Sequence, residues 1–552
     1  MSPLFHSLAS GRRRPLRSFL MLTVLSAGVA AAQIASVGLS SVRGQRFDNE
    51  DLLFFVPQEG DRFATSVAAG DFNGDGVEDL ATGMPYDDGL VGSGLTDTGA
   101  VIVRFGAART GLATGIADTV LSQFASGSPS PPESGELFGY ALAVGDFNGD
   151  GYDDLAVGIP FDWVPNTPDC YGGGPKPAGS VQIHYGLPGG IQTAGEHWLH
   201  QSLPGFDWCN REYDRFGAAL AAGDFDADGW GDLAIGAPYS TVFYNGSFDA
   251  GVVYAVYGHF GGVMPAFSQK IHQDVDGVED VIQAGDKFGY ALAVGDFNDD
   301  FRDDLAIGVP GEEGVGAFQV VMSSPSGLVL ANDAIYQQAD IGGGPNEAGD
   351  WFGATLAVGD FDGDSIDDLA VGSPQEALGS ANMTGKIDVL YGDLVSWFDP
   401  TRYEHFTQGS IYGTSAADGA FDYFGDALAA GDFDRDGFDD LAVGQPGDDV
   451  GGGARGGVTI LSGGLGGLYD RFRFLTAGIG GILPDAQNGS GVGSALARGD
   501  FDADGYDDLA IGIPWRTEAG VSSVGAETVL YGSLFSDGFD SNNLFYWSAT
   551  AP

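Results

Sequence analysis

The sequence predicts an all-β fold, a seven-bladed β-propeller of four-stranded blades, and three observations lead to it. An acidic heptapeptide of the type Gly-Asp-Phe-Asn-Gly-Asp-Gly occurs seven times along the chain. The copies are evenly spaced, with a mean period of about 71.5 residues between Asp71 and Asp500, which indicates one repeat array rather than separate domains. Short segments with period-two alternation surround each copy, as expected of β-strands. Four-stranded sheets repeated around an axis form a propeller.

Each repeat contains four expected strands, taken here in chain order. A run of small residues such as 138–144 precedes the acidic heptapeptide, and a short apolar run such as 155–160 follows it. The third strand alternates, as in 251–257, and the fourth is less regular, as in 198–202 or 270–273. Ala and Gly in the first strand suit the crowded position next to the propeller axis.

The composition requires a folded core and excludes some partners. Of 552 residues, 77 are Asp or Glu and 23 are Lys or Arg, which gives a formal net charge of −54. A content of 43% hydrophobic residues is too high for a disordered acidic chain. The excess of acid argues against nucleic acid or an anionic membrane surface as a partner.

The N-terminus carries an export signature. A basic segment with Arg12, Arg13, Arg14 and Arg17 precedes an apolar stretch, 19–29, and three alanines end at Ala32. This pattern predicts a signal peptide over 1–32, with a short membrane anchor as the alternative. No later stretch is apolar enough to span a bilayer. We therefore expect a secreted protein, extracellular or periplasmic or held at the cell surface, without a membrane span.

The propeller is expected to occupy 33–535 and to close through its N-terminal segment. Only three strands follow the start of the seventh repeat, whereas the apolar segment 51–55 precedes the first repeat with nothing else to pair. We expect this segment to complete the last blade and remove an exposed sheet edge. The segment 536–552 lies outside the repeat and resembles short sorting tails of exported bacterial proteins.

The acidic loops carry the chemistry that the sequence predicts. Side-chain oxygens at loop positions 1, 3, 5 and 9, with the carbonyl of position 7, can converge on one Ca²⁺, as in the first half of an EF-hand loop, and a strand rather than a helix follows. Mg²⁺ is the competing ion and a solvated acidic turn is the alternative. The expected ligands are Asp71, Asn73, Asp75, Val77, Asp79, Asp146, Asn148, Asp150, Tyr152, Asp154, Asp224, Asp226, Asp228, Trp230, Asp232, Asp296, Asn298, Asp300, Arg302, Asp304, Asp360, Asp362, Asp364, Ile366, Asp368, Asp432, Asp434, Asp436, Phe438, Asp440, Asp500, Asp502, Asp504, Tyr506 and Asp508.

The seven loops are not expected to bind calcium equally. Position 6 is Gly in five loops, where it permits a tight turn, but it is Phe301 in loop 4 and Ser365 in loop 5. A bulky residue at positive φ is strained. We therefore expect up to seven sites, with loop 4 the weakest.

The two cysteines fall in loops that should emerge on one face, opposite the acidic loops. Cys170 lies between the second and third strands of the second blade, and Cys209 between its fourth strand and the next blade. An exported chain permits a disulfide between them, closing about 40 residues and worth roughly 3 to 4 kcal/mol. A pair of free thiols is the alternative.

The repeat resembles a known family. Phe-Gly pairs at 138–139, 216–217, 288–289, 352–353 and 424–425, with Gly-x-Pro closings such as 236–238, are similar to the FG-GAP repeat of integrin α-subunit propellers. The first and last copies depart from it, with Phe63-Ala64 and Val492-Gly493. The resemblance implies calcium in the hairpin loops, and ligand and partner-subunit contacts through the loops that join strand 2 to strand 3 and strand 4 to strand 1.

By this resemblance, an aromatic patch on those loops is the candidate ligand face. Its residues are Phe161, Trp163, Tyr171, Phe206, Trp208 and Tyr213. Trp and Tyr anchor interfaces and stack on sugars. The alternative is that these side chains only pack long loops.

Two classes of function follow from the sequence. The first is a secreted calcium-binding propeller, monomeric, that binds an extracellular protein or glycan, as in cell adhesion. The second is a propeller-based extracellular polysaccharide lyase or hydrolase that uses acidic residues. No P-loop, HExxH or GxSxG motif is present, so no catalytic residue is assigned.

Overall fold

The computed structural model describes seventeen segments, which together span the repeats. They are residues 40–47, 58–89, 93–112, 118–125, 127–165, 175–195, 197–206, 210–242, 248–273, 281–331, 333–379, 381–394, 397–413, 418–449, 453–476, 487–517 and 520–532. The predicted signal peptide, the segment 51–55, both cysteines and the segment 536–552 lie outside the described residues.

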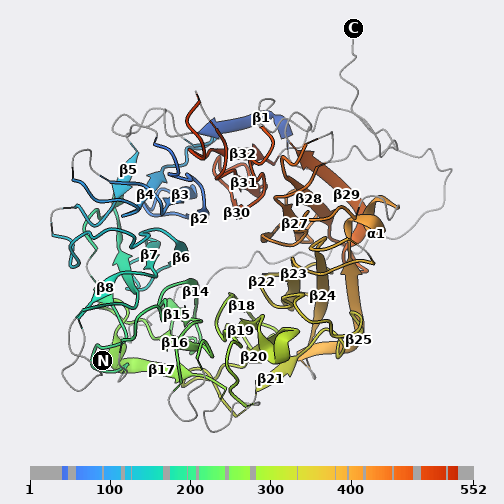
Figure 1. The fold of residues 1–552 in the computed structure, drawn as a ribbon, viewed down its shortest axis with the longest axis horizontal. Coiled ribbons are helices and arrows are strands. Elements are labelled where there is room, and N and C mark those ends of the chain that lie inside the picture. Colours follow the sequence, from blue (N-terminus) through green and yellow to red (C-terminus); the bar gives the residue numbers. More distant parts are fainter. Residues whose placement is uncertain are drawn as a thin grey trace, which may run out of the picture.

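Seven four-stranded antiparallel sheets surround a common axis (Figure 1). In chain order, their strands are β2 Ser66–Gly70, β3 Asp79–Met84, β4 Ala100–Arg104 and β5 Thr119–Leu121; β6 Ala141–Gly145, β7 Asp154–Ile159, β10 Ser180–His184 and β13 His197–Leu199; β14 Ala219–Gly223, β15 Asp232–Ala237, β16 Val252–Val256 and β17 Ser268–Ile271; β18 Leu292–Gly295, β19 Asp304–Val309, β20 Ala317–Val321 and β21 Asp333–Tyr336; β22 Thr355–Gly359, β23 Asp368–Ser373, β24 Lys386–Asp393 and β25 Trp397–Phe406; β26 Leu428–Gly431, β27 Asp440–Gln445, β28 Gly457–Ser462 and β29 Tyr469–Thr476; and β30 Ala495–Gly499, β31 Asp508–Gly512, β32 Glu527–Tyr531 and β1 Ser40–Phe47. The predicted seven-bladed propeller is confirmed.

Short elements decorate the blades without changing this plan. The second blade adds two small hairpins, and the fifth leads into a five-residue helix. These elements are β8 Trp163–Val164 with β9 Lys176–Pro177, β11 Gly186–Leu187 with β12 Gly190–Ile191, and α1 Gln408–Tyr412. No helix within the described segments is long and apolar enough to cross a membrane.

The N-terminal strand closes the ring, but it is a different segment from the one the sequence predicted. β1 (Ser40–Phe47) pairs antiparallel with β32, with Phe47 opposite Glu527. The sequence favoured the segment 51–55 for this strand because that segment is more apolar. An outer strand, however, binds mainly through its backbone, and of the described side chains of β1 only Phe47 is buried. The principle of closure was right and the residues were wrong.

The hydrophobic core lies between neighbouring blades. Phe at loop position 2 and Phe of the Phe-Gly pair are buried throughout the ring, as shown by Phe72 and Phe138, which pack in one cluster with Val101 and Leu155 from two blades. The first strands of adjacent blades contact one another all round the ring, including β2 with β30. Each blade therefore covers the face of the next, and the ring has no unpaired end blade.

The Phe-Gly pair docks each blade onto the one before it. Phe138 forms a parallel bridge with Gly99, the residue just before the third strand of the preceding blade. Gly99 has φ +81°, and a Cβ there would lie 2.2 Å from the Phe138 carbonyl oxygen. Only glycine suits both demands. The same bridge is formed at six of the seven blade junctions, by Val492 in the last blade and by Phe63 with Gly525 at the ring closure.

Strand direction divides the loops between two faces. Each acidic loop joins strand 1 to strand 2 and therefore lies at one end of its blade. The residues that precede strand 1 and follow strand 2 lie at the other end, because the two strands are antiparallel. We call these ends the acidic-loop face and the opposite face.

Candidate metal centres

The Asp at loop position 9 begins the second strand of every blade and anchors the loop from beneath. In all seven loops its Oδ1 accepts the backbone N–H of a residue near the end of the third strand, at 2.7–3.0 Å. In five loops its Oδ2 also accepts the N–H of position 2, as from Phe147 to Asp154 at 2.9 Å. These seven carboxylates are 0–2% exposed. Their place is therefore fixed by the sheet itself.

The carboxylates above this anchor are oriented by the backbone of the loop. In all seven loops the position 6 N–H donates to the position 1 carboxylate at 2.8–3.1 Å. In all seven the position 7 N–H donates to the position 5 carboxylate at 2.9–3.1 Å. These hydrogen bonds turn the backbone around a centre that the remaining carboxylate oxygens can face.

Four of the loops bring three acids close enough to share one ion. One oxygen from each of the three lies within 4.8 Å of the others. The groups are Asp224, Asp226 and Asp232; Asp360, Asp362 and Asp368; Asp432, Asp434 and Asp436; and Asp500, Asp502 and Asp504. Oxygen-only donor sets of this kind suit Ca²⁺, a hard cation. The Asn residues at position 3 of the first, second and fourth loops add an amide oxygen of the same type.

Burial gives the anchoring carboxylates unusual protonation behaviour. Desolvation raises the pKa of Asp79 to about 8 and that of Asp440 to about 9, and neighbouring loop aspartates raise it further. In the seven anchors the pKa lies between about 7 and about 9. Ionised carboxylates held this close repel one another. A divalent cation among them would offset that repulsion.

Position 6 is left-handed in every loop, as the sequence predicted. The five glycines there have φ of 82–93°, while Phe301 has φ 66° and Ser365 has φ 74°. Position 4 is also left-handed, although it is Ala227, Asp299, Arg435 or Ala503 in four of the loops. The sequence analysis did not predict a positive φ at position 4.

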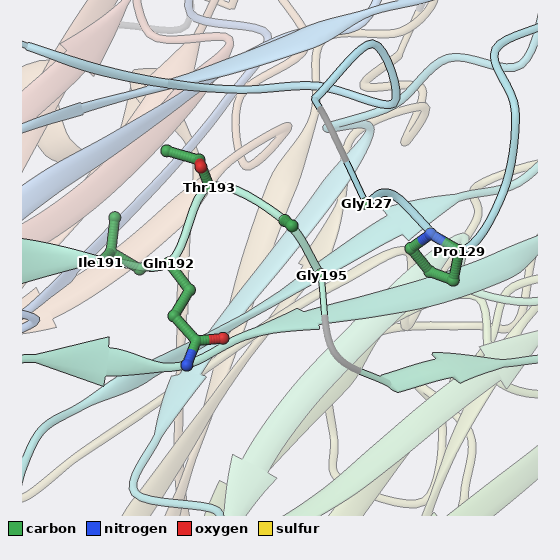
Figure 2. Close-up of a pocket in the computed structure, with 7 residues that line it drawn as sticks. Gly127, Pro129, Ile191, Gln192, Thr193 and Gly195 are labelled. Atoms are coloured by element: carbon green, nitrogen blue, oxygen red, sulfur yellow. The ribbon is translucent and has the colours of Figure 1, made fainter.

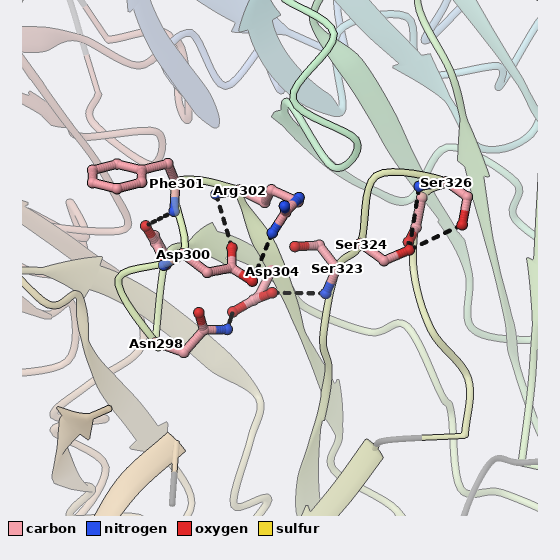
Figure 3. A network of polar contacts seen from close by, with 10 residues as sticks. Asn298, Asp300, Phe301, Arg302, Asp304, Ser323, Ser324 and Ser326 are labelled. Carbon is pink, nitrogen blue, oxygen red and sulfur yellow. Dashed lines mark hydrogen bonds and ion pairs between the residues drawn. The ribbon is translucent and has the colours of Figure 1, made fainter. Parts of the chain in front are cut away.

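Loop 4 combines a bulky residue at the left-handed position 6 with a cation on one of its expected ligands (Figure 3). Phe301 is 80% exposed, so its ring gains little packing in return for its backbone conformation. The guanidinium of Arg302 lies 2.9 Å from the carboxylate of Asp300, an expected ligand. In loop 5, Arg402 pairs in the same way with Asp362. A cation already bound to a ligand carboxylate competes with Ca²⁺ for it.

Replacing Phe301 with Gly is expected to strengthen calcium binding at loop 4 about fivefold, since a left-handed conformation costs an L-residue about 1 kcal/mol that glycine avoids. We assume that the metal-free loop can relax this strain and that the bound loop cannot. Calorimetric calcium titration would report the change in the weakest step. Gly437→Phe in loop 6 is the matched control and should weaken binding by a similar factor. An unchanged weakest step in Phe301→Gly would contradict the ranking of the loops.

Position 8 joins the loops of neighbouring blades, a role that the sequence analysis missed. The N–H of Asp71 donates to the carboxylate of Asp153 in the next loop at 2.9 Å, and the N–H of Asp153 donates back to the Asp71 carbonyl at 3.2 Å. The pattern recurs around the ring and closes through Glu78 and Asp500. Gly231 supplies only its N–H. The available signal was that six of the seven position 8 residues are acidic.

The candidate ligand face is partly described. Trp163 is 43% exposed and Tyr213 is 57% exposed, and both lie on the opposite face because they belong to its loops. Phe161 is half-buried, with its ring centroid 6.4 Å from that of Tyr213. Phe206 is only 3% exposed and packs against Phe216 and Tyr254 in the core, so it offers no binding surface. Tyr171 and Trp208 fall outside the described residues, as does the predicted disulfide between Cys170 and Cys209, which stays a prediction.

A shallow depression lies at the outer rim between the first two blades (Figure 2). Its volume is about 680 Å³, and it is lined by Gly127, Pro129, Ile191, Gln192, Thr193, Ala194 and Gly195. None of these side chains is charged or titratable. The depression therefore offers no group for acid–base or metal chemistry.

Comparison with known proteins identifies the repeat. The FG-GAP repeat family matches residues 63–103, 138–184, 216–256, 288–321, 352–390, 424–461 and 492–525, one match in each blade. The departures at Phe63-Ala64 and Val492-Gly493 therefore fall in true copies of the repeat.

Individual relatives match over part of their length. Integrin alpha-PS2 of Drosophila melanogaster is 34% identical over 46% of this chain, and phosphatidylinositol-glycan-specific phospholipase D of Rattus norvegicus is 35% identical over 32% of it. The matches cover 16% and 21% of those proteins, so this chain spans a small part of their length. A solved structure, the exotype rhamnogalacturonan lyase YesX, overlaps 89% of this chain and 76% of its own with a TM-score of 0.44 at 13% identity, a likeness too weak to bear on function.

Proposed function

Because the chain is an FG-GAP repeat protein with seven copies of the repeat in one closed ring, we propose that it is an exported, calcium-binding β-propeller that binds a protein or glycan ligand. The metal ions would occupy the acidic loops and hold the blades in place. The ligand would bind on the opposite face.

The arrangement of the loop carboxylates carries the calcium part of this proposal. Four groups of three acids lie within 4.8 Å, and a buried anchor lies beneath each of the seven loops. Such a concentration of negative charge costs stability unless a cation offsets it. Seven loops with oxygen donors alone, in a flexible turn, favour Ca²⁺ over Mg²⁺, which demands a rigid octahedron and gives up its waters reluctantly.

Two observations support a ligand on the opposite face. Relatives named as integrin α-subunits are 34% and 31% identical to parts of this chain, and the resemblance to integrin propellers implies that this face makes their contacts. Trp163 and Tyr213 expose aromatic surface there, in insertions of the second blade. Single exposed aromatic side chains are common, but large aromatic rings grouped on one loop system favour an interface.

The ligand-binding proposal is tested with the calcium-saturated chain on a glycan array and on a panel of extracellular proteins. Replacing Trp163 and Trp208 with Ala should weaken binding at least tenfold, the loss expected for two aromatic anchors of about 1–2 kcal/mol or more each. The midpoint of urea unfolding should not change. Trp397→Ala, in the outer strand of the fifth blade, is the matched control and should retain binding.

Each other outcome has a defined meaning. Retained binding in the double variant would exclude the aromatic patch as the ligand site. Shortened glycan products after incubation would identify an enzyme, because only an enzyme changes its ligand. Absence of any bound protein or glycan would contradict the proposed function.

A further inference from the structure

Three cations of this very acidic chain lie against aromatic rings on the opposite face, and two of them, Arg215 and Lys287, share the ring of Tyr239. The three are Arg62, Arg215 and Lys287, each of which directly precedes a Phe of the repeat motif. The aromatic partners are Tyr86, Phe161, Tyr239, Tyr290 and Trp351. We call these eight residues the cation–aromatic cluster. All its members precede strand 1 or follow strand 2 of their blades. They therefore lie around the inner strands at the end opposite the acidic loops.

The cations and rings are in direct contact, across blade boundaries. The Arg215 guanidinium carbon lies 3.9 Å from the ring centroid of Tyr239 in its own blade and 5.0 Å from that of Phe161 in the preceding blade. The Lys287 ammonium lies 4.3 Å from the Trp351 centroid in the following blade. Arg62 lies 4.3 Å from the Tyr86 centroid. The rings thus hold the cations in place while leaving part of each side chain at the surface.

The cations of the cluster have no carboxylate partner in the described part of the chain. No described Asp or Glu oxygen lies within 4.0 Å of a side-chain nitrogen of Arg62, Arg215 or Lys287. The acids that influence them from farther away are Asp97 for Arg62 and Asp249 for Lys287. In a chain with 77 acids and 23 bases, these three bases lie against rings rather than carboxylates, which leaves their charge available to an anionic ligand.

The backbone supports the same conclusion. Arg62, Arg215, Lys287 and Trp351 all have positive φ, between 51° and 60°. The equivalent residue of the last blade is Gly491, with φ 70°, so glycine satisfies this position without strain. Leu137 and Tyr423 have φ 63° and 56° at this position of the second and sixth blades, so a charged or aromatic side chain is nevertheless present in five of the seven blades. Strain of this kind is typical of functional sites, where the side chain is needed.

We propose that the cation–aromatic cluster binds a carboxylated sugar, a uronic acid unit of an acidic glycan. This inference rests on the proposed ligand face and names the class of ligand. A pyranose ring offers an apolar face for Tyr and Trp rings, hydroxyls for the phenol groups, and a carboxylate for Arg or Lys. Tyr86, Tyr239 and Tyr290 make no side-chain hydrogen bond within the described part of the chain, so their hydroxyls are available. An acidic peptide would use the cations but not this combination of rings and hydroxyls.

The experiment compares three probes on the calcium-saturated chain, with free calcium held constant because uronates bind it. The probes are a hexuronic-acid hexasaccharide, its carboxyl-reduced neutral counterpart, and hexaglutamate. We expect the hexasaccharide to bind, the reduced form to bind at least tenfold more weakly, and hexaglutamate to bind more weakly than the hexasaccharide. Each of Arg215→Gln and Lys287→Gln should weaken hexasaccharide binding about tenfold, as expected for loss of one charge-assisted hydrogen bond. Arg109→Gln makes the same charge change on the acidic-loop face, where Arg109 is exposed, and should leave binding unchanged.

The outcomes separate this inference from the proposed function. If Arg109→Gln weakened hexasaccharide binding as much as Arg215→Gln and Lys287→Gln do, the loss of affinity would follow from net charge alone. That result would overturn the assigned site. Stronger binding of hexaglutamate would overturn the sugar class in favour of an acidic peptide. Binding of other glycans or proteins without any uronate binding would overturn this inference while the proposed function stands. Unchanged unfolding midpoints of the two variants show that a loss of binding is local.

Discussion

Replacing Glu527 with Gln is expected to lower the free energy of unfolding by about 3–5 kcal/mol, because it removes the buried partner of Arg104 and leaves only the partly exposed carboxylate of Asp118. Arg104 and Glu527 form an ion pair between the first and last blades, and they are 1% and 0% exposed. Thr82 also donates to the Glu527 carboxylate at 2.6 Å. Strand β1, which closes the ring, covers the pair, with the Arg104 guanidinium 4.3 Å from the Phe47 ring. The measurement is urea unfolding of the purified chain.

Two further variants test whether the loss of stability in Glu527→Gln comes from the ion pair between the first and last blades. Asp118 is the second carboxylate near Arg104, at 3.3 Å, but it is partly exposed, so Asp118→Asn should cost less than about 1 kcal/mol. Adding Arg104→Met to Glu527→Gln should recover part of the loss, since no buried charge then remains unpaired. A change below about 0.5 kcal/mol in Glu527→Gln would mean that this pair does not hold the ring closed.

Removing calcium with a chelator is expected to lower the melting temperature by about 10 °C. At a free calcium concentration roughly ten times the dissociation constant, each site contributes about 1.4 kcal/mol, so seven sites contribute about 10 kcal/mol. A propeller of about 500 residues has an unfolding entropy near 1 kcal/mol per kelvin. Differential scanning calorimetry of the same preparation with and without chelator measures the shift.

Magnesium provides the control for this prediction. Readdition of Ca²⁺ should restore the melting temperature, whereas the same concentration of Mg²⁺ should restore less of it. An unchanged melting temperature after complete removal of calcium would exclude a structural role for the metal. Equal recovery with both ions would mean that the loops do not select calcium.

Much of the fold could be predicted because it repeats. Seven acidic heptapeptides fixed the number of blades, and the small residues around Asp146 identified the first strands. The closing strand β1 (Ser40–Phe47) could not be located from the sequence, because an edge strand binds through backbone groups that every residue has. The burial of Phe206 could not be predicted either, because the sequence pattern of a long loop is the same whether its aromatic side chain packs in the core or faces solvent.

The candidate sites divide in the same way. The metal ligands follow from local spacing, so Asp224, Asp226 and Asp232 could be assigned before their oxygens were known to lie within 4.8 Å of one another. The cation–aromatic cluster joins Arg215 to Phe161 from another blade, and no local pattern reports a contact across blades. The Asp71–Asp153 hydrogen bond between loops was missed for the same reason.

The central claim is that the acidic loops are calcium sites, and counting the bound ions tests it most directly. After equilibrium dialysis against saturating calcium, the metal content should approach seven ions per chain. The double variant Asp432→Asn, Asp436→Asn should bind one ion fewer, because these residues are two of the three acids grouped in loop 6. A content near zero, or one that does not change in the variant, would contradict the account.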